Sequence, residues 1–272
     1  AFAIGGGLAL VVMDRFDSRV RSERDVEGSI GVPCIGLVPR RRRFKLGRAR
    51  HDLIDNPFNI YGEALRSVVA TALSRRRVAV RKRDLRDCAV FAITSSERGE
   101  GKTTLAVSFA VSAGALGQRV LLIDLDFRNP GIADALGSLE KEGTTHTRGA
   151  DAAERAVEKN AELGIDCLRL ADRREYAFSF LSTNQLLNII NKFKDHYDCI
   201  VIDSPPLLNA TETRAIVSVA DNVIFVLKWG VTDIDIAGRA LRQLQHAGIK
   251  DIQRRVLGVI TQVNPRKHRF YR

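Results

Sequence analysis

Residues 88–104 read CAVFAITSSERGEGKTT, and this stretch decides the fold. It begins with a short apolar run at 88–94 that is rich in β-forming residues, and it continues into a glycine-containing loop. The residues that follow, up to 116, are typical of a helix. A strand, such a loop and a helix in this order form a phosphate-binding loop, in which backbone N–H groups and the helix N-terminus face an anion. We therefore expect a P-loop domain that binds a nucleotide.

The loop contains the first candidate site residues. Lys102 is expected to reach the β- and γ-phosphates, and the Thr103 hydroxyl is expected to ligate Mg²⁺. Ser96 stands where the first glycine of such loops usually lies. The candidate cofactor-binding residues of the loop are Ser96, Gly99, Glu100, Gly101, Lys102, Thr103 and Thr104.

Two further segments place acids at the ends of apolar strands. Asp124 and Asp126 lie in LLIDLDFR (121–128), and Asp203 ends CIVID (199–203). Open α/β sheets bind ligands at the carboxyl ends of their strands, so these acids are candidates for holding Mg²⁺ and accepting a proton. A strand end stabilised by salt bridges is the alternative for the first pair. The candidate catalytic residues are Lys102, Asp124, Asp126 and Asp203, and the candidate metal ligands are Thr103, Asp126 and Asp203.

The rest of the chain alternates strand and helix patterns. Strands are predicted at 88–94, 119–124, 165–171, 199–203, 222–228 and 256–262, and helices at 60–74, 101–116, 183–197 and 233–248. Residues 130–163 are polar and weakly patterned. The alternation predicts an α/β fold of the P-loop NTPase class, with a mostly parallel sheet covered by helices on both faces.

The N-terminal residues 1–13 (AFAIGGGLALVVM) are apolar and uncharged. A helix that spans a bilayer needs about 20 such residues, so we expect this stretch to be the end of a transmembrane helix in a longer protein. A buried N-terminal helix is the alternative. We expect residues 14–59 to form a juxtamembrane segment and basic linker, 60–264 the P-loop domain, and 265–272 a tail that contains Tyr271.

The formal net charge is +11 and is unevenly distributed. Residues 40–50 and 75–86 each carry seven Lys or Arg residues and together contain one acid, so these two stretches account for the whole positive excess. The first stretch follows soon after the apolar N-terminus, which favours an anionic membrane surface over nucleic acid as the partner, with a solvated linker as the alternative. The four cysteines form no metal-binding spacing, and Cys88 and Cys199 are predicted to pack in the core.

The order of SSERGEGKTT (95–104), LLIDLDFR (121–128) and YDCIVIDSPP (197–206) resembles that of the bacterial tyrosine kinases, or BY-kinases, where these motifs are named Walker A, A′ and B. The main rivals are MinD/ParA-like ATPases, which typically carry a lysine early in the loop. Glu97 stands at that position here and favours the kinases. The segment after the apolar N-terminus is similar to the exit from the second membrane helix of polysaccharide co-polymerases.

This resemblance implies a membrane-anchored protein-tyrosine autokinase that uses ATP and Mg²⁺ and regulates exopolysaccharide biosynthesis and export. It adds Arg128 to the cofactor-binding residues and makes Tyr271 the candidate acceptor, phosphorylated by a neighbouring subunit. Glu63 and Arg66 become candidate contacts of a ring-shaped homo-oligomer. The implied partners are the polysaccharide polymerase and export machinery. The implied location is the cytoplasmic side of the bacterial inner membrane, with no nucleic acid bound.

Three positions depart from the family pattern. Val69 stands where the ring motif has a second Arg, Arg98 replaces a proline common in the loop, and only Tyr271 lies near the C-terminus. Gln262 also stands where many relatives carry an Asn near the base. These departures keep open a second hypothesis, a co-polymerase scaffold that binds nucleotide with little or no kinase activity.

Overall fold

The computed structural model is built on one sheet of eight strands, in the order β1-β8-β7-β2-β6-β3-β5-β4. All neighbouring strands are parallel except β4 and β5. The structure describes residues 18–41, 51–56, 58–79, 88–136, 153, 156–169, 183–208, 212–246, 249 and 251–268. The strands are β1 (Cys34–Pro39), β2 (Ala89–Ser95), β3 (Val120–Asp124), β4 (Val157–Asn160), β5 (Ile165–Arg169), β6 (Cys199–Asp203), β7 (Asn222–Lys228) and β8 (Val256–Val263).

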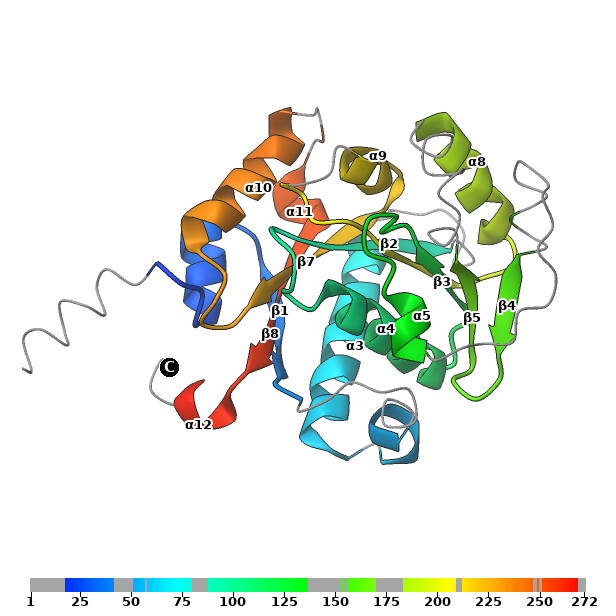
Figure 1. Cartoon of the computed structure of the whole chain (residues 1–272), viewed down its shortest axis with the longest axis horizontal. Helices are drawn as coiled ribbons and strands as arrows, with labels where there is room; N and C mark the ends of the chain where they lie inside the picture. The colour runs from blue at the N-terminus through cyan, green and yellow to red at the C-terminus, as the bar shows by residue number, and fades with distance from the viewer. Residues whose placement is uncertain are drawn as a thin grey trace, which may run out of the picture.

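Helices cover both faces of the sheet (Figure 1). The helices α3 and α4 lie on one face, and α8, α9 and α10 lie on the other. The predicted doubly covered, mostly parallel sheet is therefore confirmed. The described helices are η1 (Asp25–Ile30), η2 (His51–Asp55), α3 (Ile60–Ala79), α4 (Lys102–Ala115), α5 (Ile132–Leu136), α8 (Thr183–Lys194), α9 (Glu212–Val219), α10 (Ile234–His246), α11 (Ile252–Arg255) and α12 (Pro265–His268).

The central strand β2 is buried on both faces. Phe91 and Ile93 pack in the cluster formed with α3 and α4, whereas Val90 and Ala92 pack in the cluster formed with α8 and α9. Successive side chains of a strand point to opposite faces, which is why a strand buried on both sides has a continuous apolar sequence. Cys88 and Cys199 are buried in these clusters, as predicted.

The first strand lies where the sequence analysis expected a linker. Cys34–Pro39 pairs in parallel with β8 at the edge of the sheet, so this part of 14–59 belongs to the domain. An edge strand tolerates Pro39, because one side of its backbone needs no ladder partner. The remaining strand and helix predictions are confirmed, while β4, α9 and the helices of four to six residues were not predicted because these elements are short.

The chain segment before η1 is attached to the loop between β7 and α10. The N–H of Val20 donates to the Thr232 carbonyl at 2.8 Å, and the N–H of Ile234 donates to the Ser18 carbonyl at 2.7 Å. The indole N–H of Trp229 donates to the carbonyl of Arg21 at 2.9 Å. The described chain is therefore packed against the domain from its first residues.

Several predictions concern residues outside the described part. These are the transmembrane helix end at 1–13, most of both basic stretches, and Tyr271 in the tail. Among the described residues, no helix combines the length and the apolar character that crossing a membrane requires.

We expect Gly36→Ala to destabilise the protein by about 1–3 kcal/mol, as overpacking does. A Cβ at Gly36 would lie 2.5 Å from Cγ2 of the buried Val68 on α3, so β1 and α3 would have to separate. Chemical denaturation measures the loss. Gly28→Ala is the matched control, because a Cβ there meets nothing within 4 Å. In a Val68→Ala background the cost of Gly36→Ala should shrink; an equal cost in both backgrounds would contradict this packing.

Candidate active site

The sheet register brings the ends of three strands to one place. β6 pairs with β2 on one side and β3 on the other, with Asp203 opposite Ile93 in β2 and opposite Asp124 in β3. The P-loop follows β2 directly. Because paired residues of parallel strands lie at the same level, Asp124 and Asp203 meet beside the start of the P-loop.

The P-loop backbone depends on two glycines. Gly99 and Gly101 have φ angles of +80° and +96°, a region that residues with a side chain rarely adopt. Gly101 is also the N-cap of α4, so the helix begins with Lys102. A Cβ at Gly101 would lie 3.4 Å from Oγ1 of Thr261 and 3.5 Å from Nε2 of Gln262. The ends of β8 and the P-loop are thus in close contact.

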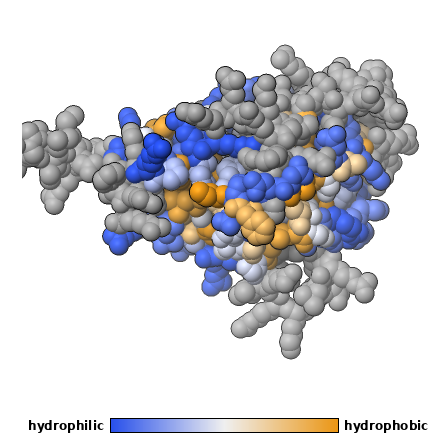
Figure 2. All heavy atoms as spheres, turned by 90° about the horizontal axis from the view of Figure 1, so that it is seen from below, coloured by the Kyte–Doolittle hydropathy of each residue, from blue (hydrophilic) through white to orange (hydrophobic). Residues whose placement is uncertain are grey.

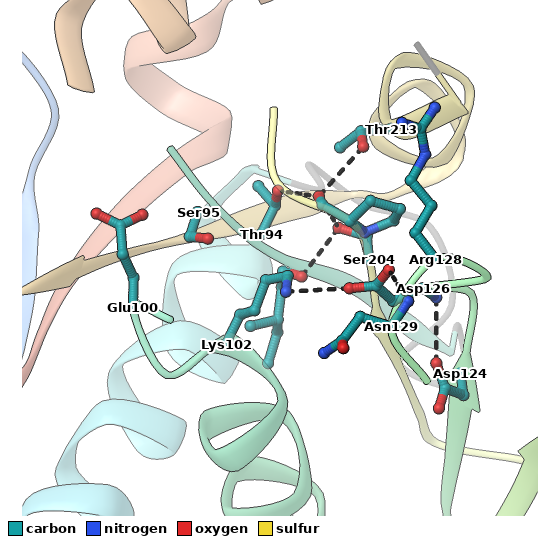
Figure 3. A network of polar contacts seen from close by, with 12 residues as sticks. Thr94, Ser95, Glu100, Lys102, Asp124, Asp126, Arg128, Asn129, Ser204 and Thr213 are labelled. Atoms are coloured by element: carbon teal, nitrogen blue, oxygen red, sulfur yellow. Dashed lines mark hydrogen bonds and ion pairs between the residues drawn. The ribbon is translucent and has the colours of Figure 1, made fainter. Parts of the chain in front are cut away.

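Lys102 points from the first turn of α4 toward the aspartates (Figure 3). It is 5% exposed, and its Nζ lies 3.0 Å from Oδ2 of Asp126, which is 1% exposed. The other carboxylate oxygen of Asp126 accepts the N–H of Asn129 at 3.1 Å. A buried charge needs a partner, and this ion pair supplies one for each residue.

Asp124 is engaged by the backbone of the loop after β3. Its Oδ1 accepts the N–H of Asp126 at 3.1 Å, and its Oδ2 accepts the N–H of Ile132 at 3.3 Å. These bonds shape the connection between β3 and α5. The carboxylate thus organises the loop that carries Asp126, and its predicted catalytic role stays a prediction.

Asp203 is the least compensated charge of the site. It is fully buried, and neither of its carboxylate oxygens has a hydrogen-bond partner of normal geometry. Burial, followed by the negative charge of Asp124, raises its pKa to about 8. The nearby Thr103 hydroxyl and the Lys102 ammonium act in the opposite direction.

The residues at this position fit a magnesium ion bound together with a nucleotide. Mg²⁺ usually takes one or two protein oxygen ligands and completes its shell with water and substrate phosphates. Thr103 and Asp203 are neighbours with oxygens suited to this role, and a cation would offset the crowded carboxylates. Among the described residues, no group of three His, Cys, Asp or Glu side chains is arranged to hold a metal ion by itself.

The loop after β6 is held against the end of β2. The backbone N–H and the hydroxyl of Ser204 both donate to the Ile93 carbonyl, at 3.1 and 2.9 Å. The hydroxyls of Thr94 and Thr213 donate to the carbonyl of Pro205, at 2.8 and 3.1 Å (Figure 3). None of these three residues was predicted from the sequence. Thr94 and Ser204 carry hydroxyls at the ends of predicted strands, which is a signal that the sequence offers, whereas Thr213 on α9 has no such signal.

Two predicted cofactor-binding residues have other partners in the structure. Arg128 turns toward α9, where its Nε lies 2.7 Å from Oε1 of Glu212 (Figure 3). The Glu100 side chain points away from Lys102, toward the loop after β7. Their direct contact with a nucleotide remains a prediction.

Comparison with known proteins identifies the family. The AAA domain family matches residues 88–256. Over 174 residues, the chain is 30% identical to the tyrosine-protein kinase CpsD of Streptococcus agalactiae, covering 59% of this chain and 71% of that protein. The chain belongs to the family of bacterial tyrosine kinases. This confirms the resemblance on which the sequence analysis relied.

Longer relatives and solved structures agree with this bacterial tyrosine kinase family. The chain is 28% identical over 280 residues to the succinoglycan biosynthesis transport protein ExoP of Rhizobium meliloti, which covers 94% of this chain but 35% of ExoP. The fold matches the BceF tyrosine kinase domain with a TM-score of 0.71, at 23% identity over 90% of this chain and 100% of that one. It also matches the kinase domain of Escherichia coli ETK with a TM-score of 0.70 and 18% identity. That match covers 89% of this chain and 94% of the ETK domain.

The structure shows where two of the departures from the bacterial tyrosine kinase pattern lie, Val69 and Arg98. Val69, in place of the second Arg of the ring motif, is fully buried in the hydrophobic cluster between α3 and the sheet, whereas Glu63 is exposed. Arg98 is exposed at the tip of the P-loop. Neither substitution places a charge in the core, so both are compatible with the fold.

We expect Asp203→Asn to raise the melting temperature of the nucleotide-free protein at pH 8. The folded-state pKa of Asp203, about 8, lies above the ordinary 3.8, so the folded state holds a proton that the unfolded state releases. Its contribution to stability therefore decreases as pH rises between these two values. Asparagine does not titrate, so the difference in melting temperature should be large at pH 8 and small near pH 4.

Differential scanning fluorimetry with a chelator present measures this difference. The exposed Asp195→Asn is the matched control and should change little at either pH. A melting temperature of Asp203→Asn that is unchanged or lowered at pH 8 would contradict the buried, uncompensated charge.

Proposed function

We propose that the protein is an ATP-dependent protein-tyrosine autokinase. The observation that carries the proposal is the convergence of Lys102, Thr103, Asp126 and Asp203 at the carboxyl end of the sheet, next to the P-loop. Membership of the bacterial tyrosine kinase family supports the same reaction. The chain spans about a third of ExoP, so the activity and partners of the whole protein belong to this proposal.

The buried residues have distinct roles in the proposed reaction. Backbone N–H groups of the P-loop bind the phosphates, and Lys102 neutralises charge on the transferred group. Thr103 and Asp203 hold Mg²⁺, which when bound supplies further neutralisation of phosphate charge. The tyrosine oxygen attacks the γ-phosphorus, the bond to the β,γ-bridging oxygen breaks, and ADP leaves.

Asp126 is the candidate base that accepts the tyrosine proton. In the structure its Oδ2 is paired with Lys102 at 3.0 Å. Phosphates compete for the same ammonium, so nucleotide binding releases this carboxylate for proton transfer. Asp124 is a weaker candidate, because each of its oxygens already accepts a backbone N–H.

The described tyrosines narrow the choice of acceptor. Tyr61 is buried, with its hydroxyl 2.9 Å from Oγ of Ser108. The half-buried Tyr197 donates to Asp166 at 2.8 Å, and burial followed by this bond raises its pKa. Of the four tyrosines in the sequence, Tyr176 and Tyr271 remain as candidates, and the tail position favours Tyr271.

A second copy of the chain is the proposed partner for phosphorylation in trans. Glu63 and Arg66 lie on α3, which begins at Ile60, and Ile60 and the preceding Phe58 are 70% and 85% exposed. Seen from the side on which α3 and α4 lie, apolar side chains appear among hydrophilic ones (Figure 2). This mixture suits an oligomer contact. The name of ExoP supports a role in polysaccharide biosynthesis and transport, and the apolar N-terminus supports attachment to the inner membrane.

We expect Lys102→Met to abolish phosphotyrosine formation while the fold is retained. The variant removes the ammonium that neutralises the phosphates, and methionine fills similar space. The measurement is incubation of the chain with Mg-ATP, followed by mass spectrometry of phosphopeptides. Clear ATP binding by the parent without any phosphotyrosine would reject the kinase and favour a nucleotide-binding scaffold. Equal phosphorylation of the parent and Lys102→Met would reject this site.

Tyr271→Phe is expected to remove most of the phosphotyrosine. The substitution deletes the acceptor oxygen and leaves the P-loop unchanged, so ATP binding should match that of the parent. Tyr176→Phe is the matched control. The proposal for Tyr271 fails if phosphorylation persists in Tyr271→Phe and disappears in Tyr176→Phe.

A further inference from the structure

The Glu100 carboxylate lies on the opposite side of the P-loop from Lys102 (Figure 3). It is 4% exposed, so both of its oxygens need hydrogen-bond donors. Oε2 accepts the backbone N–H of Glu97 at 2.8 Å, and Oε1 accepts the hydroxyl of Thr232. The first bond closes the loop on itself, and the second joins it to the segment after β7.

Thr232 is itself held in place on both sides. Its hydroxyl accepts the N–H of Lys228 at 2.8 Å while donating to Glu100, and its own N–H donates to the carbonyl of Lys228 at 3.0 Å. Its carbonyl accepts the N–H of Val20 at 2.8 Å. Thr232 is 4% exposed and therefore offers a rigid anchor for the carboxylate.

Two further bonds reach the same part of the loop. Nζ of Lys228 donates to the carbonyl of Gly99 at 3.3 Å, and the Thr261 hydroxyl donates to the carbonyl of Glu100 at 2.8 Å. The two acceptor carbonyls lie between the α-carbons of Gly99 and Gly101, the two residues of the loop with left-handed backbone. The ends of β7 and β8 therefore hold the loop in one conformation.

We propose that Glu100 is a positioning residue whose buried carboxylate, anchored by Thr232, holds the P-loop in the conformation that binds phosphates. Glu100 then acts through the backbone and does not touch the nucleotide. The inference rests on the proposed nucleotide-binding function and assigns Thr232, which no motif marks, to the same machinery. Losing the anchor removes a hydrogen bond from the buried carboxylate and the acceptor of the Lys228 N–H, so the loop must rearrange.

The test compares Thr232→Val with Thr232→Ser. Valine keeps the volume but can neither donate to Glu100 nor accept from Lys228, whereas serine can do both. We expect Thr232→Val to raise the Kd and the KM for ATP about tenfold, equivalent to about 1.4 kcal/mol. The kcat should stay within about twofold, because Lys102 and Asp126 are unchanged. Thr232→Ser should restore the parent values, and the exposed Thr183→Val on α8 should behave like the parent.

A second pair of variants covers the case in which Thr232→Val fails to fold. Glu100→Gln keeps a carbonyl oxygen for the Glu97 N–H and can donate to the Thr232 hydroxyl, whereas Glu100→Ala loses both bonds. Weaker ATP binding in Glu100→Ala than in Glu100→Gln is the expected result. Unchanged ATP affinity in Thr232→Val, or equal affinity in the two Glu100 variants, would overturn the positioning role while the nucleotide site stands. A parent that does not bind ATP would overturn the proposed function, and this inference with it.

Discussion

Asp124 and Asp203 end neighbouring parallel strands at the same level, and the site is organised around these two buried carboxyl groups. Each carboxylate is compensated differently. Asp124 accepts two backbone N–H groups, whereas Asp203 has no hydrogen-bond partner of normal geometry and keeps a raised pKa. The Lys102 ammonium at the start of α4 moderates the charge from the other side. The carboxyl groups of this site are only partly compensated by protein donors and by Lys102. Such a site is suited to a cation that binds together with the phosphates of a nucleotide.

The position of β2 in the strand order explains how the P-loop is supported. β2 lies between β6 and β7, so chain segments approach the loop from both sides. On the β6 side, Ser204 and the N–H of Leu207 bind the end of β2. On the β7 side, Thr232 binds the Glu100 carboxylate. A phosphate-binding backbone needs such support, because its glycines allow many other conformations.

The segment that precedes the P-loop domain is also part of its structure. β1 extends the sheet beyond β8, and residues 18–21 bond to the loop that contains Thr232. The chain therefore enters the domain beside the residue that anchors the P-loop. Any part of a longer protein that precedes residue 18 connects to the domain at this point.

The sequence by itself determined the strands, the helices and the identity of the motif residues. These features depend on local patterns, such as an apolar run before a glycine-containing loop, and the structure reproduces them from β2 to β8 except for β4, α9 and the shortest helices. It did not determine that Cys34–Pro39 joins the sheet, because a short edge strand has no periodicity of its own. Only the tertiary structure decided that Arg128 meets Glu212 and that Glu100 meets Thr232. The direction of a long polar side chain depends on which donors and acceptors distant elements bring within reach, and packing alone settles that.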